Sequence, residues 1–329
     1  MKKTLSLLLA LTLLLSISAV AGAEKVKLVV SLTAVSTDTH AMAMREFKKT
    51  VEELSGGEIE VELHTDAVLF TQEEEVVAVA GGDADISLIS ASWLTTGSPW
   101  VGMFTAGYVF KSYDQMTQVY NGEIGKEVFA RLGQEQGILP LSAWYLGSRQ
   151  ISLTNDKEIK TPADLNGINL RMPNSEAWLL LGRALGANPT PISFSELYLA
   201  LQTGVVDGQD NPLPTVESAK FYEVQKSITI TNHLVDSVWP CINLDRWNSL
   251  SEEHQDILMK GVEAGRKYCD ETNLEREANL VKFFEESGLK VYHADLDAFA
   301  DHVLEFYLND PFSQSWDKDL LEKVRAVGQ

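Results

Sequence analysis

The sequence predicts an α/β protein of two lobes, and three features of the chain carry this prediction. Segments of strand character alternate with amphipathic helices, as in layered folds built on mostly parallel sheets. No internal repeat and no linker rich in Pro, Gly or Ser interrupts the alternation, so we expect strands that cross between the lobes to join them. One helical stretch, from about Glu252 to Ser287, would be about 50 Å long, so we expect it to brace both lobes.

The N-terminal part supplies the first strands and helices of this alternation. KVKLVVSL at 25–32 predicts a strand, and residues 38–57 predict an amphipathic helix whose apolar residues step by three and four. The alternating apolar residues of 57–64 predict a half-buried strand. TQEE at 71–74 is a capping box that opens the next helix, and DISLIS at 85–90 predicts the strand that follows it.

The second half continues the pattern with longer extended segments. Ser193 and Glu196 form a second predicted capping box. We interpret VVDGQDNPLP at 205–214 as a loop, because Gly, Pro, Asp and Asn are typical turn residues. The other expected elements are two extended segments within 139–154, a helical turn capped by Thr161, a strand at 168–173, helices at 174–186 and 193–204, and a strand-rich stretch at 227–244.

The first residues have the organisation of a secretory signal peptide. Two lysines precede an apolar run from Leu5 to Val20, which is short for a membrane span, and small residues follow it. We predict a signal peptide over 1–23, cleaved near Ala23, and an exported protein without direct membrane insertion. An uncleaved membrane anchor is the alternative interpretation.

The composition excludes several classes of partner and site. The chain of 329 residues has 47 Asp and Glu against 27 Lys and Arg, a formal net charge of −20, which disfavours nucleic acid and anionic membranes as partners. Cys241 and Cys269 are too far apart for a CxxC redox or zinc motif. We expect two buried free thiols, and a disulfide between them stays open because export permits one.

No sequence motif for a cofactor, a metal or an enzyme occurs. The chain has no GxxxxGK[ST] or GxGxxG loop, no HExxH and no GxSxG elbow, so we predict no cofactor and no metal. Glu73, Glu74 and Glu75 are consecutive and point in different directions on a helix. We interpret them as favourable charges at the positive N-terminal end of that helix.

Two arginines lie at the ends of predicted strands with no acidic residue beside them in sequence, Arg149 in GSRQ and Arg171 in LRMP. A guanidinium group binds a carboxylate through two parallel hydrogen bonds, and burying it without an anion costs several kcal/mol. The residues alone leave two interpretations, an internal ion pair with a distant Asp or Glu and a site for an anionic ligand. In the first interpretation, Asn211 in DGQDNP is a turn residue, which is the usual role of Asn before Pro.

Several long blocks resemble the substrate-binding proteins of TRAP transporters, the DctP-type family. They are WYLGSRQISLTN, TPADLNGINLRMPNSEAW, GANPTPISFSELYLALQTGVVDGQDNPL and SAKFYEVQKSITITNHLVD. The resemblance implies a two-lobed clamshell similar to the type II periplasmic binding proteins, with crossing hinge strands and a long helix that braces both lobes. It places 24–146 and about 237–276 in the first lobe, and about 147–236 and 277–329 in the second.

The same resemblance implies a function and a binding site. Proteins of this family are periplasmic receptors, not enzymes, that bind a small organic acid between the lobes and deliver it to a TRAP permease of a small and a large membrane subunit. The Arg of the LR(M/V)P block binds the ligand carboxylate, which implies this role for Arg171. Arg149 is implied to assist it, and Asn211 to hydrogen-bond the same carboxylate. The other residues at lining positions of such relatives are Thr33, Gln72, Ser90, Trp93, Asn174 and Phe194.

The identity of the ligand stays open. Ser90 and Trp93 stand where relatives that bind sialic acid carry charged groups, so we predict a ligand other than sialic acid. Aromatic or keto acids, sugar acids and C4-dicarboxylates all fit the implied site. Two other functions are also open, an exported enzyme acting on a carboxylate substrate and the ligand-sensing module of a membrane receptor.

Overall fold

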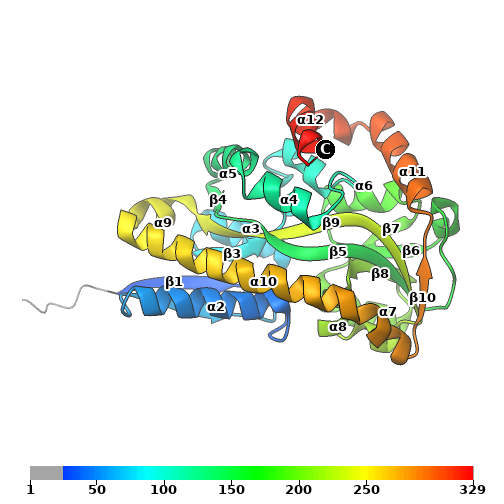
Figure 1. Ribbon diagram of the computed structural model, residues 1–329, viewed down its shortest axis with the longest axis horizontal. Coiled ribbons are helices and arrows are strands. Elements are labelled where there is room, and N and C mark those ends of the chain that lie inside the picture. Colours follow the sequence, from blue (N-terminus) through cyan, green and yellow to red (C-terminus); the bar gives the residue numbers. More distant parts are fainter. Residues whose placement is uncertain (1–24, 329) are drawn as a thin grey trace, which may run out of the picture.

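The computed structural model describes residues 25–328, and its central feature is one ten-stranded sheet that runs through both lobes (Figure 1). The strand order is β2-β1-β3-β9-β5-β8-β6-β7, and β4 and β10 each pair with β9. The strands are β1 (Val26–Ser31), β2 (Ile59–His64), β3 (Ile86–Ile89), β4 (Ile138–Pro140), β5 (Trp144–Leu153), β6 (Asn169–Met172), β7 (Asn188–Pro191), β8 (Gly208–Pro212), β9 (Ser227–Asn243) and β10 (Lys290–His293). The predicted signal peptide lies outside the described residues.

The strand β9 joins the two halves of this sheet. Over Ser227 to Val238 it pairs antiparallel with β5, and over Trp239 to Ile242 it pairs antiparallel with β3 of the first lobe. The predicted crossing strands are therefore confirmed. The prediction of mostly parallel sheets holds only for the outer strands, because β1 pairs parallel with β2 and β3, and β6 pairs parallel with β7 and β8.

The long helix α10 (Glu252–Glu286, 35 residues) confirms the predicted brace. It packs against α2 of the first lobe and against β5, α8 and β10, so it extends along both lobes (Figure 1). The other helices are α2 (Thr39–Leu54), α3 (Gln72–Gly81), α4 (Tyr113–Tyr120), α5 (Glu123–Gln136), α6 (Glu176–Ala184), α7 (Phe194–Thr203), α8 (Leu213–Ser218), α9 (Leu244–Ser249), α11 (Leu296–Asn309) and α12 (Lys318–Ala326). The 3-10 helices are η1 (Ala91–Leu94), η2 (Pro99–Thr105), η3 (Pro162–Leu165), η4 (Phe221–Val224) and η5 (Phe312–Ser315).

Polar side chains of α10 fix the irregular part of β5. Tyr145 donates its backbone N–H to Asp270 Oδ1 at 2.7 Å, and Ser148 donates its backbone N–H to Glu277 Oε1 at 2.6 Å. Between them the ladder with β9 shifts register, and Gly147 has a φ of +129°, which a residue with a side chain rarely adopts. These contacts fix the irregular part of β5 against α10.

Two predictions of local structure are wrong. The segment predicted as a loop at 205–214 contains β8 and the start of α8, because β8 lies between β5 and β6 and all five of its residues are buried. Neighbouring strands thus override the turn character of Asp210, Asn211 and Pro212. The capping box predicted at Ser193 is absent, since its side chain accepts no hydrogen bond at the start of α7, whereas the box of Thr71 and Glu74 on α3 is present.

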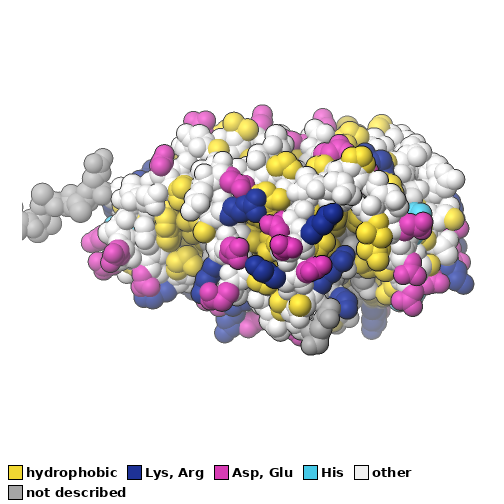
Figure 2. All heavy atoms as spheres, turned by 90° about the horizontal axis from the view of Figure 1, so that it is seen from above, with side chains coloured by type: hydrophobic (Ala, Val, Ile, Leu, Met, Phe, Trp, Pro, Cys, Tyr) yellow, Lys and Arg dark blue, Asp and Glu magenta, His cyan; other side chains and the backbone are white. Residues whose placement is uncertain are grey.

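One face of the molecule carries charges of both signs, and the two cysteines lie in the interior. Acidic and basic side chains are interspersed on the face in Figure 2, so the negative charge is not gathered in one patch there. Cys241 and Cys269 are both buried and free, as expected. Within residues 25–328 every helix is too short or too polar to span a bilayer, and no cluster of His, Cys, Asp and Glu is arranged to hold a metal ion.

We expect Gly265→Ala to destabilise the fold, because α10 packs closely against buried Trp144. A Cβ atom at Gly265 would lie 2.5 Å from Trp144 Cη2 and 3.1 Å from the carbonyl oxygen of Ala43. The expected loss in the free energy of unfolding is about 1–3 kcal/mol, measured by chemical denaturation. The matched control is Gly81→Ala on α3, where the nearest atom is 3.8 Å away and the change should be neutral or slightly stabilising. Equal effects of the two substitutions would contradict the close packing.

Candidate functional site

A cavity lies between the first lobe, represented by α2, α3 and η1, and the second lobe, represented by β6, α6 and α7. It encloses about 750 Å³, including its opening to solvent. Of the predicted site residues, those that line it are Thr33, Gln72, Ser90, Trp93, Arg149, Arg171, Phe194 and Asn211. Asn174 does not line it, because it follows the end of β6 and its side chain is exposed.

Arg171 is a buried cation that lacks an ionic partner. Its side chain lies on β6, the residue is 1% exposed, and Nε donates a hydrogen bond to the carbonyl oxygen of Ile192 at 2.7 Å. Nη2 is buried without a hydrogen-bond partner, and within residues 25–328 no carboxylate lies within ion-pair distance of this guanidinium. Burial lowers the pKa of Arg171 to about 10, so the group is still cationic at neutral pH. The geometry is that of a site that an anion would complete.

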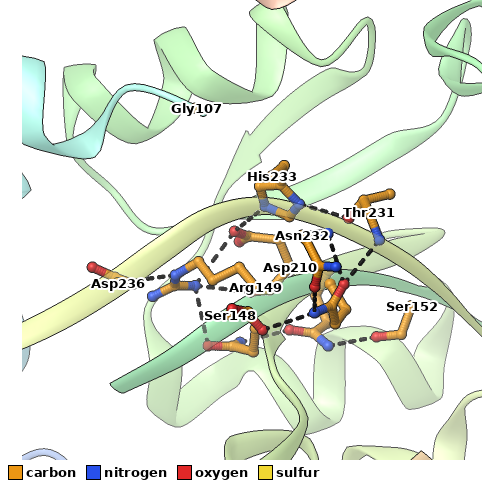
Figure 3. Close-up of polar contacts among 12 residues, drawn as sticks. Gly107, Ser148, Arg149, Ser152, Asp210, Thr231, Asn232, His233 and Asp236 are labelled. Carbon is orange, nitrogen blue, oxygen red and sulfur yellow. Dashed lines mark hydrogen bonds and ion pairs between the residues drawn. The ribbon is translucent and has the colours of Figure 1, made fainter. Parts of the chain in front are cut away.

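Arg149 differs from Arg171 because the protein neutralises it internally. Nε donates to Asp236 Oδ2 at 2.7 Å, and Nη1 lies 3.4 Å from Asp210 Oδ2 (Figure 3). The guanidinium carbon also lies 4.1 Å from the ring centroid of Trp178. The internal ion pair, which was one of the two interpretations of the sequence, is therefore what the structure shows for this residue. Arg149 borders the cavity as a compensated charge.

The carboxylate of Asp210 links Arg149 to a buried histidine. His233 Nε2 lies 3.3 Å from Asp210 Oδ2, and His233 Nδ1 lies 2.8 Å from Thr231 Oγ1 (Figure 3). Burial opposes ionisation of Asp210, but Arg149 and His233 together hold its pKa below the usual value. Four polar side chains from β5, β8 and β9 thus form one network behind the cavity.

Asn211 is held in one orientation beside Arg149. Its Oδ1 accepts a hydrogen bond from Arg149 Nη1 at 3.3 Å, and its Nδ2 donates to Gln209 Oε1 at 2.5 Å. Gln209 in turn donates to Ser152 Oγ at 2.5 Å. The amide therefore lines the cavity from a fixed position on β8, as a preformed binding site requires.

Three acidic or basic residues that the sequence analysis did not place in the site also line the cavity, namely Asp38, His40 and Glu75. His40 Nδ1 lies 2.6 Å from Asp38 Oδ1, and Asp38 Oδ2 accepts a hydrogen bond from Ser218 Oγ of α8 at 2.7 Å. The Asp38 carboxylate therefore links the first lobe to the second. No spacing in the sequence signals this contact, because its partners are 180 residues apart.

Glu75 lies in the first turn of α3, as the sequence predicts, but it is buried there instead of facing solvent. It is 2% exposed, and its Oε1 accepts a hydrogen bond from Ser31 Oγ at 3.1 Å. Burial raises the pKa of Glu75 to about 8. A signal for this was present, since Ala78 and Val79 follow at three and four residues and all three lie on the buried face of the helix.

Comparisons with known proteins agree with this architecture. The profile of the bacterial extracellular solute-binding proteins of family 7, DctP, matches residues 30–310. The sialic acid-binding periplasmic protein SiaP of Vibrio cholerae is 34% identical over 278 residues, which cover 84% of this chain and 85% of that protein. The 2,3-diketo-L-gulonate-binding periplasmic protein YiaO of Escherichia coli is 30% identical, and the match covers 88% of this chain and 89% of that protein.

A crystal structure from Roseobacter denitrificans shows the same two-lobed fold. It is a TRAP periplasmic solute-binding protein with bound 3-deoxy-D-manno-oct-2-ulosonic acid, 42% identical to this chain, with a TM-score of 0.89. The match covers 92% of this chain and 100% of that one. The extent of these matches shows that the chain belongs to family 7 of the bacterial extracellular solute-binding proteins, the DctP family of TRAP solute receptors.

Proposed function

We propose that this protein is a periplasmic receptor that binds a small organic acid between its lobes and delivers it to the membrane subunits of a TRAP transporter. The observation that carries the proposal is the buried, unpaired guanidinium of Arg171 on the cavity wall. The ligands named for the three relatives above are all carboxylic acids, which such a guanidinium binds through two parallel hydrogen bonds. Asn211 and Arg149 flank the same position.

The proposed mechanism is ligand-dependent closure of the two lobes. A ligand that touches both cavity walls binds the closed arrangement more tightly than the open one and shifts the population toward it. We place the lobe boundary within β5 near Gly147 and within β9 near Val238, as the sequence analysis predicted. Contacts between the lobes support this arrangement, since Arg276 of α10 donates to Thr39 Oγ1 at 2.6 Å and also pairs with Glu217 of α8.

We propose a binding function without turnover. The family consists of solute receptors, and the buried charges of Arg149, Asp210 and Asp236 are paired with one another as structural groups. Delivery to a small and a large permease subunit, and export through cleavage near Ala23, belong to the same proposal. An exported enzyme would convert an organic acid in a product assay with purified protein, and we expect no conversion.

The decisive experiment is a thermal-shift screen of organic acids, followed by calorimetry on Arg171 variants with the acid that stabilises the protein most. Arg171→Ala should reduce the affinity at least tenfold, about 1.4 kcal/mol or more, because the carboxylate loses its only free cation among the described lining residues. Arg171→Lys should also weaken binding, since a point charge does not replace the planar fork.

The matched control for this experiment is Arg183→Ala. Arg183 lies on α6, is paired with Glu176 at 2.6 Å and has a side chain that is 40% exposed. Its substitution by alanine therefore removes the same charge at a distance from the cavity. We expect the affinity of Arg183→Ala for the acid to stay within about twofold of the affinity of the original protein. An unchanged affinity in Arg171→Ala would remove this residue from the site.

The two arginines should respond differently to removal in the absence of ligand. Arg149→Ala leaves the buried carboxylates of Asp210 and Asp236 without their cation, so we expect a loss of about 3–5 kcal/mol in the free energy of unfolding. Arg171→Ala removes a buried cation that has no carboxylate partner, and we expect a much smaller loss. Chemical denaturation of both variants measures the difference, and equal losses would contradict the assignment of a compensated and an uncompensated arginine.

A further inference from the structure

We infer that Glu75 hydrogen-bonds a hydroxyl group of the ligand, and that the cavity therefore selects a polyhydroxylated monocarboxylic acid over a dicarboxylic acid. This inference rests on the proposed function, because it assumes that the ligand carboxylate binds at Arg171. It assigns a specificity-determining role to a residue of the opposite wall.

The position of Glu75 gives the first step. The residue lies on α3 of the first lobe, lines the cavity and is 2% exposed, so its carboxyl group is separated from bulk water. Ser31 Oγ donates to Oε1 at 3.1 Å, and Ser87 and Thr33 also donate hydrogen bonds to this carboxyl group. A protonated carboxyl group has in addition one O–H to donate, and an acceptor for it would have to lie inside the cavity.

The protonation state of Glu75 gives the second step. Burial raises its pKa to about 8, which leaves the carboxyl group protonated and neutral at neutral pH. A neutral carboxyl group both donates and accepts a hydrogen bond, and so does an alcohol. A ligand hydroxyl is therefore a better partner for Glu75 than a second carboxylate, which accepts only and carries a charge into a buried site.

The remaining polar groups of the first-lobe wall support the same ligand. Thr33, Gln72 and Ser90 line the cavity. These hydroxyl and amide groups bind alcohols through one or two hydrogen bonds each. A chain of ligand hydroxyls would bond these groups and accept the Glu75 proton, whereas an apolar acid would leave that proton without an acceptor in the ligand.

Among the described residues that line the cavity, no second cation is free to bind a carboxylate. Arg149 is paired with Asp210 and Asp236, and His40 is paired with Asp38 at 2.6 Å. Arg171 is thus the one lining cation without a carboxylate partner, and it accommodates one ligand carboxylate. A dicarboxylic acid would place its second charge against the first-lobe wall, where no lining cation is free.

The first test compares matched probes on the original protein by calorimetry. The polyhydroxylated probes are 3-deoxy-D-manno-oct-2-ulosonic acid, D-galactonate and D-gluconate, and the contrasting probes are succinate and hexanoate, which lacks the hydroxyls of the six-carbon acids. We expect the tightest polyhydroxylated probe to bind at least tenfold more tightly than succinate and hexanoate. Succinate binding as tightly as that probe would overturn the inference and leave the proposed receptor function intact, whereas binding of no acid would overturn both.

The second test changes Glu75 and uses the tightest polyhydroxylated probe. Glu75→Leu should weaken binding at least tenfold, and the conservative Glu75→Gln should restore most of the affinity, because an amide also donates and accepts. The matched control is Glu74→Gln, which removes a charge from the same helical turn, keeps the capping box with Thr71 and lies on the exposed side. An affinity of Glu75→Leu within twofold of the original would overturn the assignment.

A third measurement detects the Glu75 proton without any ligand. The folded-state pKa is raised from 4.5 to about 8, so the stability that Glu75 contributes is fully present below about pH 4.5 and is lost as the pH rises through about 8. The original protein should therefore lose stability relative to Glu75→Gln between pH 5 and pH 8. The other charged or titratable groups of the lining, Asp38, His40, Arg149 and Arg171, are present in both proteins. A difference independent of pH would show an ionised Glu75 and overturn its role as a donor.

Discussion

The site depends on one buried positive charge that the protein itself does not neutralise. Arg149 and Arg171 look alike in the sequence, each at the end of a strand and without an acidic neighbour. In the fold, β9 and β8 bring Asp236 and Asp210 within ion-pair distance of Arg149. Arg171 on β6 donates to the carbonyl oxygen of Ile192, and no described carboxylate lies within ion-pair distance of it. The paired arginine stabilises the wall, and the unpaired one is left for a ligand. This asymmetry explains how a chain with a net charge of −20 can hold an anion.

The sequence predicted the architecture well wherever local pattern and tertiary structure agree. The helix α10 was expected from about Glu252 to Ser287 and spans Glu252–Glu286. The sequence predicted one helix there because the helical pattern continues over the whole stretch. The strand β8 was missed, since its Gly, Asp, Asn and Pro residues are turn formers that only the flanking strands β5 and β6 force into a ladder. Its residues are buried because β5 and β6 pair with it, and this pairing cannot be predicted from the local sequence.

The same distinction applies to the residues of the site. The resemblance to the family predicted lining positions for Arg171, Asn211 and Asn174, and the first two line the cavity. Asn174 does not line it, because it follows the end of β6 and is exposed. Glu75 was interpreted, with Glu73 and Glu74, as a favourable charge at the N-terminal end of its helix, although its spacing from Ala78 and Val79 puts it on the buried face of α3. The position of Glu75 around the helix axis therefore predicts its burial better than the presence of two neighbouring glutamates does.

In the proposed mechanism, the placement of unlike groups on opposite walls couples recognition of the ligand to closure of the lobes. Arg171, Asn211 and Phe194 belong to the second lobe, whereas Glu75, Thr33 and Gln72 belong to the first. The lobes already touch through Asp38 and Ser218, so the ligand needs to supply only the difference in free energy between the open and the closed arrangement of the lobes. A group bound at Arg171 alone would interact equally in the open and closed forms and shift neither. Only a ligand whose polar groups also reach the first-lobe wall binds the closed form more tightly than the open one. The length of the ligand and the number of its hydroxyl groups would therefore affect how often the closed form is presented to a permease.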